Sequence, residues 1–201
     1  MTPERKQKID SLLSKRQNDL TVVLENVFDP HNIAAVMRTC EAAGIMEMYI
    51  IRSILPTRKR WNDRSSASAN KWMLLHQFED AKSCFEVIRK KYSNIFCTHL
   101  NEDAQSLYSL DFTGSTALVF GNEHAGVTEE ALSYCNGNFI IPQAGIIQSL
   151  NISVACAISI YEAYRQKEKA GHYDQKKISA AEQETLLKQW KIWEYENNEI
   201  D

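Results

Sequence analysis

The sequence contains no long hydrophobic run. None of its apolar stretches approaches the roughly 18 residues that a membrane-spanning helix needs, and the charged N-terminal stretch MTPERKQKIDSLLSKRQ lacks the apolar centre of a signal peptide. The five cysteines form no CxxC pair and stand mostly in apolar runs. These absences lead us to expect a cytoplasmic protein with reduced thiols in its core and no membrane association.

Motifs that bind the phosphates of nucleotides are missing as well. The chain contains neither GxGxxG nor GxxxxGK[ST], so an ordinary dinucleotide site or P-loop is not expected. The histidines follow no zinc-binding spacing and the cysteines offer no paired ligands, so we expect no metal. The net charge of −3 gives no overall sign of nucleic-acid binding, although local basic clusters act on phosphates within a Debye length of about 8–10 Å.

What the sequence does contain is an alternation of short β-rich runs and helical periods. Strands are expected at residues 20–26, 46–52, 94–99, 115–121 and 138–142. Helices are expected between them at residues 32–43, 80–92, 128–135 and 149–170. Gly44 and Gly171 are placed to end two of these helices. Strands that alternate with helices predict an α/β fold in which a mainly parallel sheet is covered by helices on both faces.

Two further helical stretches flank this unit. Residues 3–17 are polar and basic, and residues 179–195 open with the Ser-x-x-Glu spacing of a capping box. The second stretch carries four apolar side chains on one face: Leu186, Leu187, Trp190 and Trp193. Either its own domain or a partner subunit must cover that face. We divide the chain into an N-terminal extension (1–19), one central domain (20–171) and a C-terminal extension (172–201).

Three polar segments that favour turns follow predicted strands. They read ENVFDPHNIAAVMRTCEAAG, VFGNEHAGVTEEAL and IIPQAGIIQSLNISVACAISIYEAYRQ. Because ligands of parallel sheets bind outside the carboxyl ends of the strands, we expect the three segments to converge on one site. The glycine-bracketed turn GNEHAG contains a glutamate, which would repel a phosphate, so this turn requires another kind of ligand.

In their order and separation these three segments resemble the motifs of the SpoU/TrmH family, a branch of the SPOUT methyltransferases. The resemblance extends to the basic N-terminal helix, a central SANKW and the exit EAYRQKEKAGHYD into the C-terminal helix. It implies a homodimer and a deep trefoil knot, in which the C-terminal part of the chain is threaded through a loop. It also implies that the knotted loops bind S-adenosylmethionine in a bent shape, largely through backbone groups.

The resemblance places four residues at the cofactor: Thr98, Gly121, Ile141 and Leu150. The sulfonium of S-adenosylmethionine is a cation, so the glutamate of GNEHAG is no obstacle there, and a glycine lets the backbone come close. Ile141 and Leu150 would be buried in almost any α/β domain, so their assignment rests on the resemblance alone.

The implied reaction is methyl transfer to the 2′-hydroxyl of a ribose. This hydroxyl must lie in line with the sulfonium methyl while its proton is removed or its oxyanion is stabilised. Arg38 matches the arginine held responsible for the reaction in the family. Because a guanidinium stays protonated at neutral pH, it is a poor general base. We expect Arg38 to stabilise the developing alkoxide, with the proton leaving to water or to a phosphate oxygen.

The resemblance assigns four more residues to the catalytic site: Asn32, Glu123, Ser149 and Asn151. Asn32 would cap the helix that follows it, bind a phosphate or ribose, or do both. Glu123 would accept hydrogen bonds from the ribose or orient Arg38. Ser149 and Asn151 stand at the start of the last predicted helix of the domain, where they would position the substrate; Ser149 would otherwise only cap the helix.

Basic residues gather on both extensions and at their borders, and five of them are predicted to bind RNA: Arg5, Lys8, Arg16, Arg165 and Lys167. A dimer would combine these clusters into one patch, which predicts an affinity for RNA that falls steeply with salt. The extensions and the resemblance favour tRNA as the partner and a D-loop guanosine, at tRNA position 18, as the methylated nucleotide.

Other activities stay open. A ribosomal RNA substrate is disfavoured because no room for an extra RNA-binding domain exists before residue 20, and an anticodon-loop substrate because such relatives tend to lack the extensions. A non-catalytic RNA-binding module would keep the fold without the reaction, and a nicotinamide-dependent oxidoreductase would lack its phosphate motif. Ser68, Ala69 and Asn70 stand where relatives often have glycines and a histidine, so the contact with RNA around them is also open.

Overall fold

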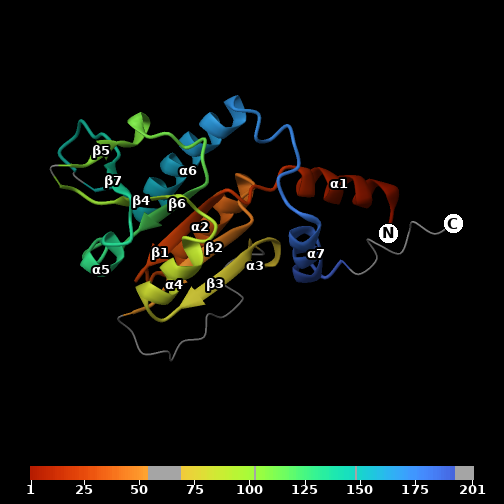
Figure 1. Cartoon of the computed structure of the whole chain (residues 1–201), viewed down its shortest axis with the longest axis horizontal. Coiled ribbons are helices and arrows are strands. Elements are labelled where there is room, and N and C mark those ends of the chain that lie inside the picture. Colours follow the sequence, from red (N-terminus) through yellow and green to blue (C-terminus); the bar gives the residue numbers. More distant parts are fainter. Residues whose placement is uncertain (54–68, 102, 148, 193–201) are drawn as a thin grey trace.

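The computed structural model describes residues 1–53, 69–101, 103–147 and 149–192. Within them the chain forms one seven-stranded sheet of order β3-β2-β1-β6-β4-β7-β5, in which every neighbouring pair is parallel (Figure 1). The strands are β1 (Leu20–Glu25), β2 (Glu47–Ile51), β3 (Leu74–Phe78), β4 (Asn94–Thr98), β5 (Gln105–Ser106), β6 (Thr116–Phe120) and β7 (Gly137–Ile140). The predicted parallel α/β fold is confirmed, and each of the five predicted strands is present.

Helices cover both faces of the sheet. They are α1 (Pro3–Ser14), α2 (Pro30–Ala42), α3 (Ala69–Trp72), α4 (Ala81–Ile88), α5 (Glu129–Leu132), α6 (Ile152–Lys169) and α7 (Ala180–Gln189), with a 3-10 helix η1 at Leu107–Ser109. The helices α2 and α6 pack together over one hydrophobic core, and α4 and α5 cover a second core. Successive residues of β1 alternate between the two cores, with Val22 in the first and Val23 in the second.

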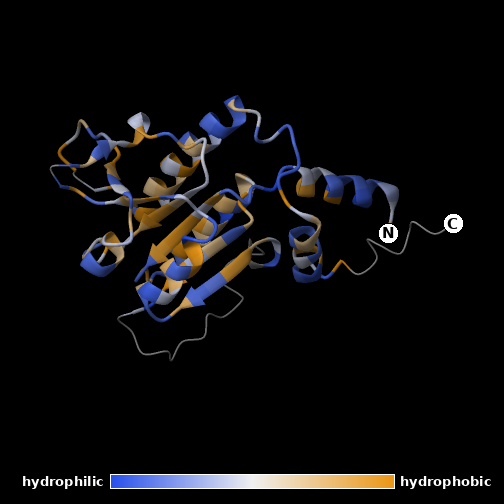
Figure 2. Cartoon of the chain, in the orientation of Figure 1, coloured by the Kyte–Doolittle hydropathy of each residue, from blue (hydrophilic) through white to orange (hydrophobic). Residues whose placement is uncertain are grey.

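The central strands are the most hydrophobic part of the molecule (Figure 2). Every residue of β1, β2 and β6 is buried, as expected for strands of a parallel sheet that is covered on both sides. None of the described helices is long and apolar enough to cross a membrane. The trefoil knot implied by the family resemblance stays a prediction.

Two helices begin at other residues than the sequence predicts. Asp29 caps α2, because it directly precedes Pro30, which favours the first position of a helix. Asn32 therefore lies inside α2 and does not cap it. Asn151 caps α6 with its side-chain oxygen, so Ser149 precedes the cap instead of forming it.

The predicted ends of these two helices are confirmed. Gly44 and Gly171 follow α2 and α6 with φ angles of 79° and 78°, which glycine adopts without steric strain. The strands β3 and β5 are not predicted from the sequence. They form the two edges of the sheet, where β3 is only partly buried and β5 spans two residues, so neither has the apolar pattern of a central strand.

The terminal helices α1 and α7 lie together at one end of the sheet (Figure 1). They share a hydrophobic cluster of Ile9, Leu13, Met46, Ile178, Leu186, Leu187, Trp190 and Ile192. Trp190 packs edge-on against Trp72 of α3, with ring centroids 5.4 Å apart. The apolar face of α7 is therefore covered by its own chain, and the predicted capping box at its start is present. Trp193 and Ser68 lie outside the described residues, as do the side chains of Ala69 and Asn70.

A buried carboxylate fixes the amino end of β2. Glu47 accepts hydrogen bonds from the hydroxyls of Tyr49 and Tyr92, both at 2.9 Å, and from the ammonium of Lys91 at 2.9 Å. Its second oxygen lies 3.0 Å from Nε2 of His76. Burial alone would raise the pKa of Glu47, but the bonds from His76, Lys91 and Tyr92 outweigh it and lower that pKa to about 2.

This lowered pKa predicts how the stability depends on acid. The contribution of Glu47 is present above the ordinary carboxyl pKa near 4.5 and is lost as the pH falls toward 2. We expect Glu47→Gln to lower the free energy of unfolding by roughly 2–3 kcal/mol at pH 7, and the difference from wild type to shrink between pH 4.5 and pH 2. Urea unfolding at several pH values measures this. The exposed Glu86→Gln is the control, and an equal pH dependence in both variants would contradict the prediction.

Candidate active site

A pocket of about 560 Å³ opens at the carboxyl ends of β4, β6 and β7. Its wall also includes residues of the loop that joins β7 to α6. All four residues predicted to bind the cofactor line this pocket: Thr98, Gly121, Ile141 and Leu150. The structure thus brings these four positions together, whereas what they bind stays a prediction.

The GNEHAG turn forms one side of this pocket and is tightly folded. Two backbone hydrogen bonds join Asn122 and Gly126, at 3.0 and 2.8 Å. A Cβ atom on Gly121 would lie 2.1 Å from the backbone carbon and oxygen of Gly126, and 2.3 Å from the nitrogen of Val127. No side chain fits there, so the glycine is required by the close approach of two backbone segments.

Asn122 holds this turn in shape and was not singled out by the sequence. Its side-chain oxygen accepts hydrogen bonds from the backbone N–H groups of His124 and Ala125, at 2.9 and 3.1 Å. Its amide donates to the carbonyl of Asn26 at the end of β1, at 2.9 Å. An asparagine directly after a glycine in a turn is a typical signal for such side-chain-to-backbone bonds, and this signal would have identified it.

Hydrogen bonds join one side chain from each of the three polar segments. The amide of Asn32 in α2 donates to Glu123 Oε1 at 2.6 Å. The amide of Asn151 donates to the side-chain oxygen of Asn32 at 3.1 Å. Glu123 also lines the pocket, together with Ser149. The three segments therefore converge on one site, as predicted, and polar groups of Asn32, Glu123 and Asn151 stand beside the pocket.

Arg38 lies apart from this cluster. It stands six residues after Asn32 on α2, a step that turns it about 120° round the helix and about 9 Å along the axis. It is exposed, it does not line the pocket, and no described residue forms a hydrogen bond or ion pair with its guanidinium. Glu123 bonds Asn32 instead of orienting Arg38. A single chain does not bring Arg38 to the pocket.

Three of the predicted RNA-binding residues are exposed. Arg5 and Lys8 lie on the solvent side of α1. Arg165 lies on α6 and bonds the carboxylate of Glu162 with two nitrogens, at 2.9 and 2.7 Å. These side chains are accessible to a polyanion.

Arg16 and Lys167 are completely buried, which corrects the prediction that they contact RNA. Lys167 donates to the carbonyl of Gly114 at 2.9 Å and pairs with Asp19 at 3.2 Å. Burial lowers the pKa of the Lys167 ammonium, and the nearby Asp19 opposes that change. Arg16 bonds Glu41 of α2 at 3.1 Å. Their partners lie far away along the chain, so composition alone gave no sign that both would be internal.

A comparison with known families decides which kind of protein has this geometry. The model of the SpoU rRNA methylase family matches residues 19–161, which include most of the chain, the first two polar segments and the third as far as residue 161. The chain belongs to the SpoU methylase family. Among its relatives is the tRNA (guanosine(18)-2′-O)-methyltransferase of Thermus thermophilus, which is 39% identical over 191 residues, covering 94% of this chain and 96% of that protein.

Solved structures of SpoU methylases have the same fold. The TrmH/SpoU tRNA modifying enzyme of Aquifex aeolicus matches with a TM-score of 0.82 and 32% identity, over 93% of this chain and 94% of that one. The SpoU methyltransferase AviRb of Streptomyces viridochromogenes, solved in complex with the cofactor AdoMet, matches with a TM-score of 0.66 over 78% of this chain and 62% of that one. Its identity of 22% shows a likeness of fold alone.

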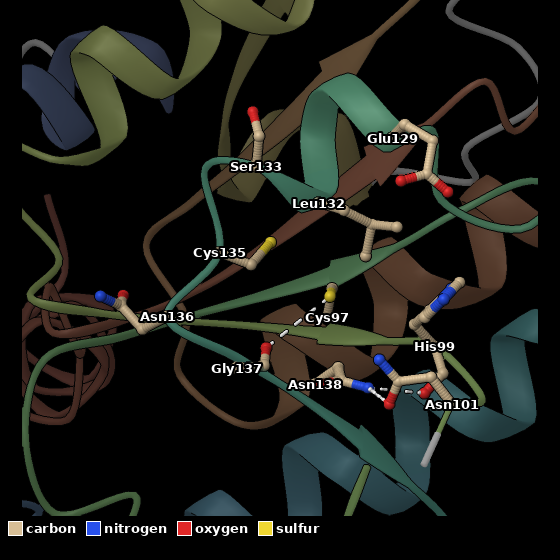
Figure 3. A pocket seen from close by; sticks show the side chains of 10 residues that line it. All are labelled: Cys97, His99, Asn101, Glu129, Leu132, Ser133, Cys135, Asn136, Gly137 and Asn138. Atoms are coloured by element: carbon tan, nitrogen blue, oxygen red, sulfur yellow. Dashed lines mark hydrogen bonds between the residues drawn. The ribbon is translucent and has the colours of Figure 1, made fainter. Parts of the chain in front are cut away.

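This SpoU methylase has a second pocket, of about 410 Å³, between β4, β7 and α5 (Figure 3). His99 lines both pockets. The thiols of Cys97 and Cys135 point into the same space, where Cys97 donates to the carbonyl of Gly137 at 3.7 Å and Cys135 to that of Ala131 at 3.3 Å. In the part of the chain that the structure describes, no three histidine, cysteine or carboxylate side chains are grouped closely enough to hold a metal ion.

Proposed function

We propose that this protein transfers a methyl group from S-adenosylmethionine to the 2′-oxygen of a tRNA guanosine, at position 18 in the D-loop. The observation that carries the proposal is the convergence of the three polar segments on one pocket in a chain of the SpoU family. Relatives that match 94% and 93% of the chain are named as enzymes of this specificity. We further propose that the reaction takes place in the cytoplasm.

The pocket suits S-adenosylmethionine in size and in chemistry. Its volume falls within the usual range for small-molecule sites, roughly 300–1,000 Å³. Exposed apolar side chains on its wall supply surface for an adenine: Leu100, Ile147 and Leu150. The carboxylate of Glu123 also lines the pocket, where a cation is favoured. When bound, the cofactor supplies an electrophilic methyl group. Thr98, Gly121, Ile141 and Leu150 are proposed to hold it there.

The polar cluster beside the pocket is proposed to bind the ribose. Asn32, Glu123 and Asn151 support one another through hydrogen bonds of 2.6 and 3.1 Å, so their orientations are fixed before a substrate arrives. Ser149, in the loop before α6, lies on the pocket wall. Such preorganised groups would hold the 2′-hydroxyl in line with the methyl group that it attacks.

Arg38 is proposed to stabilise the alkoxide across a homodimer. Its guanidinium is free of partners among the described residues and lies outside the pocket of its own chain. The helix α6, which packs on α2, exposes the apolar side chains of Val154 and Tyr161 on one face, at 45% and 50%, and Ile146 before that helix is exposed at 99%. A second copy of the chain would cover this surface and bring one subunit's Arg38 to the other subunit's pocket.

The proposed activity is tested by mapping 2′-O-methyl groups in total tRNA that lacks this modification. Incubation with the protein and S-adenosylmethionine should add a 2′-O-methyl group at guanosine 18. A methyl group at an anticodon-loop position or in ribosomal RNA would replace the proposed substrate by another within the same chemistry. The absence of methyl transfer to any RNA would favour a non-catalytic RNA-binding protein.

The exposed basic residues predict a salt-dependent affinity for tRNA. We propose that Arg5, Lys8 and Arg165 contact phosphates, whereas Arg16 and Lys167 do not. The double variant Arg5→Ala/Lys8→Ala should reduce the slope of log affinity against log salt by about 2, because each lost phosphate contact removes about one unit. Fluorescence titrations of tRNA at salt concentrations of roughly 50 to 200 mM measure this slope. Lys82→Ala on α4 is the control, and an affinity of wild type that does not change with salt would contradict the proposal.

A further inference from the structure

Arg16, just beyond the end of α1, contacts groups from four separate parts of the chain. One terminal nitrogen donates to the carbonyl of Ile45 at 3.1 Å. The other donates to Glu41 Oε1 at 3.1 Å and to the carbonyl of Trp72 at 3.2 Å. The guanidinium also lies over the ring of Trp190, 5.6 Å from its centre. Arg16 therefore connects the two terminal helices to α2.

Packing alone does not account for a guanidinium at this place. Arg16 is fully buried, and its Nε atom has no hydrogen-bond partner among the described residues. Burial disfavours a charge, and well-packed apolar residues often replace a buried ion pair without loss of stability. An ion pair is a costly way to join helices. Its presence here therefore suggests a role for neutralising the carboxylate that Arg16 binds.

That residue, Glu41, stands three positions after Arg38 on α2. Side chains at i and i+3 of a helix are neighbours, with Cβ atoms roughly 5–6 Å apart, and opposite charges at this spacing attract each other. The side chain of Glu41 is 31% exposed, so it has room to turn toward Arg38 if nothing holds it. In the structure Arg16 holds it, and Arg38 has no partner among the described residues.

We propose that Arg16 is a positioning residue for Arg38: by binding Glu41, it keeps that carboxylate from pairing with Arg38. The inference rests on the proposed function, in which Arg38 stabilises the negative charge that develops on the 2′-oxygen. A Glu41 released from Arg16 would pair with Arg38, and its negative charge, no longer offset by Arg16, would act near the reaction. The terminal helices thereby affect the chemistry through α2, without contacting the reacting atoms.

Two substitutions and their combination test this role. Arg16→Met removes the cation but keeps an unbranched apolar side chain that reaches about as far as the arginine Nε, and Glu41→Gln removes the competing charge but keeps the shape. Arg16→Met should lower kcat about tenfold, the effect of one uncompensated carboxylate about 10 Å from the developing charge at an effective dielectric constant near 20. Glu41→Gln should retain the wild-type kcat. The double variant should recover kcat while its thermal stability stays below that of wild type.

This pattern separates positioning from a purely structural role. If Arg16 only stabilises the fold, Glu41→Gln will not restore kcat, and the double variant will be as slow as Arg16→Met. Equal kcat in wild type and Arg16→Met would also overturn the proposal. Should Arg16→Met not fold, Arg16→Gln with and without Glu41→Gln supplies the same comparison, because glutamine removes the cation but still has an amide that can donate to a buried carbonyl.

The pairing of Arg38 with Glu41 can also be measured by NMR without any methyl transfer, so it is tested separately from the proposed function. The Nε–H NMR signal of Arg38, assigned by its loss in Arg38→Lys, reports whether the guanidinium is paired. It should shift and exchange more slowly with water in Arg16→Met, and return to the wild-type position in the double variant. An unchanged signal in Arg16→Met would refute the contact with Glu41 even if methyl transfer is observed. The expected shift without any methyl transfer in wild type would refute the proposed function alone.

Discussion

Replacing Arg38 by alanine is expected to lower the rate of methyl transfer by about 10²–10³, the usual effect of removing one group that stabilises an oxyanion. The side chain is exposed and makes no hydrogen bond or ion pair with any described residue, so its removal should leave the free energy of unfolding within about 0.5 kcal/mol. The pocket residues are untouched, so the affinity for S-adenosylmethionine should not change. Single-turnover transfer of tritiated methyl groups and calorimetric cofactor titration measure the two effects.

Mixing two inactive variants tests whether Arg38 acts across a dimer. Arg38→Ala retains an intact Glu123, and Glu123→Ala retains an intact Arg38. If the arginine serves the partner's pocket, the mixed dimer contains one complete site, and activity should return on mixing to roughly a quarter of the wild-type value under random exchange. If each arginine serves its own chain, no mixed site is complete and the mixture stays inactive. A monomer in sedimentation experiments would exclude the trans arrangement.

The pocket was predictable because its residues stand next to strand ends. Thr98 ends β4 and Gly121 follows β6, and both strands have apolar runs that identify them in the sequence. Since all neighbouring strands are parallel, their carboxyl ends meet at one edge of the sheet. Residues that follow different strands must then converge there, and the four residues predicted to bind the cofactor do so.

Side-chain partners were not predictable in the same way. Asn32 and Ser149 look like helix caps, but Asp29 and Asn151 compete better because they stand directly before their helices. Arg16 belongs to a basic extension, yet three internal acceptors make its burial tolerable. The hydrogen-bond partners and the burial of a side chain depend on which groups meet in space, and the order of residues along the chain does not show this. The threading of a knot is likewise a property of connectivity, not of periodicity.

Replacing Gly121 by alanine is expected to disable the pocket proposed to bind the cofactor. The added Cβ atom would lie 2.1 Å from the backbone of Gly126, far inside the contact distance, and backbone atoms cannot turn aside as a flexible side chain does. The GNEHAG turn must therefore move, which should lower the free energy of unfolding by about 1–3 kcal/mol. Because this turn forms a wall of the pocket, the affinity for S-adenosylmethionine should fall at least about tenfold, a change of roughly 1.4 kcal/mol.

Gly137→Ala is the matched control for this prediction. Its Cβ atom would meet the ring of Phe96 at 3.5 Å, an ordinary contact, and Gly137 does not line the cofactor pocket. Titrations with S-adenosylmethionine below the unfolding temperature of both variants distinguish a loss of cofactor binding from unfolding of the protein. If Gly121→Ala binds the cofactor with wild-type affinity, the turn can move without affecting the ligand. The close backbone approach would then serve only the folding of the loop. Loss of affinity in Gly121→Ala alone places the bound cofactor against this turn, where Glu123 and its hydrogen-bonded partner Asn32 meet the pocket.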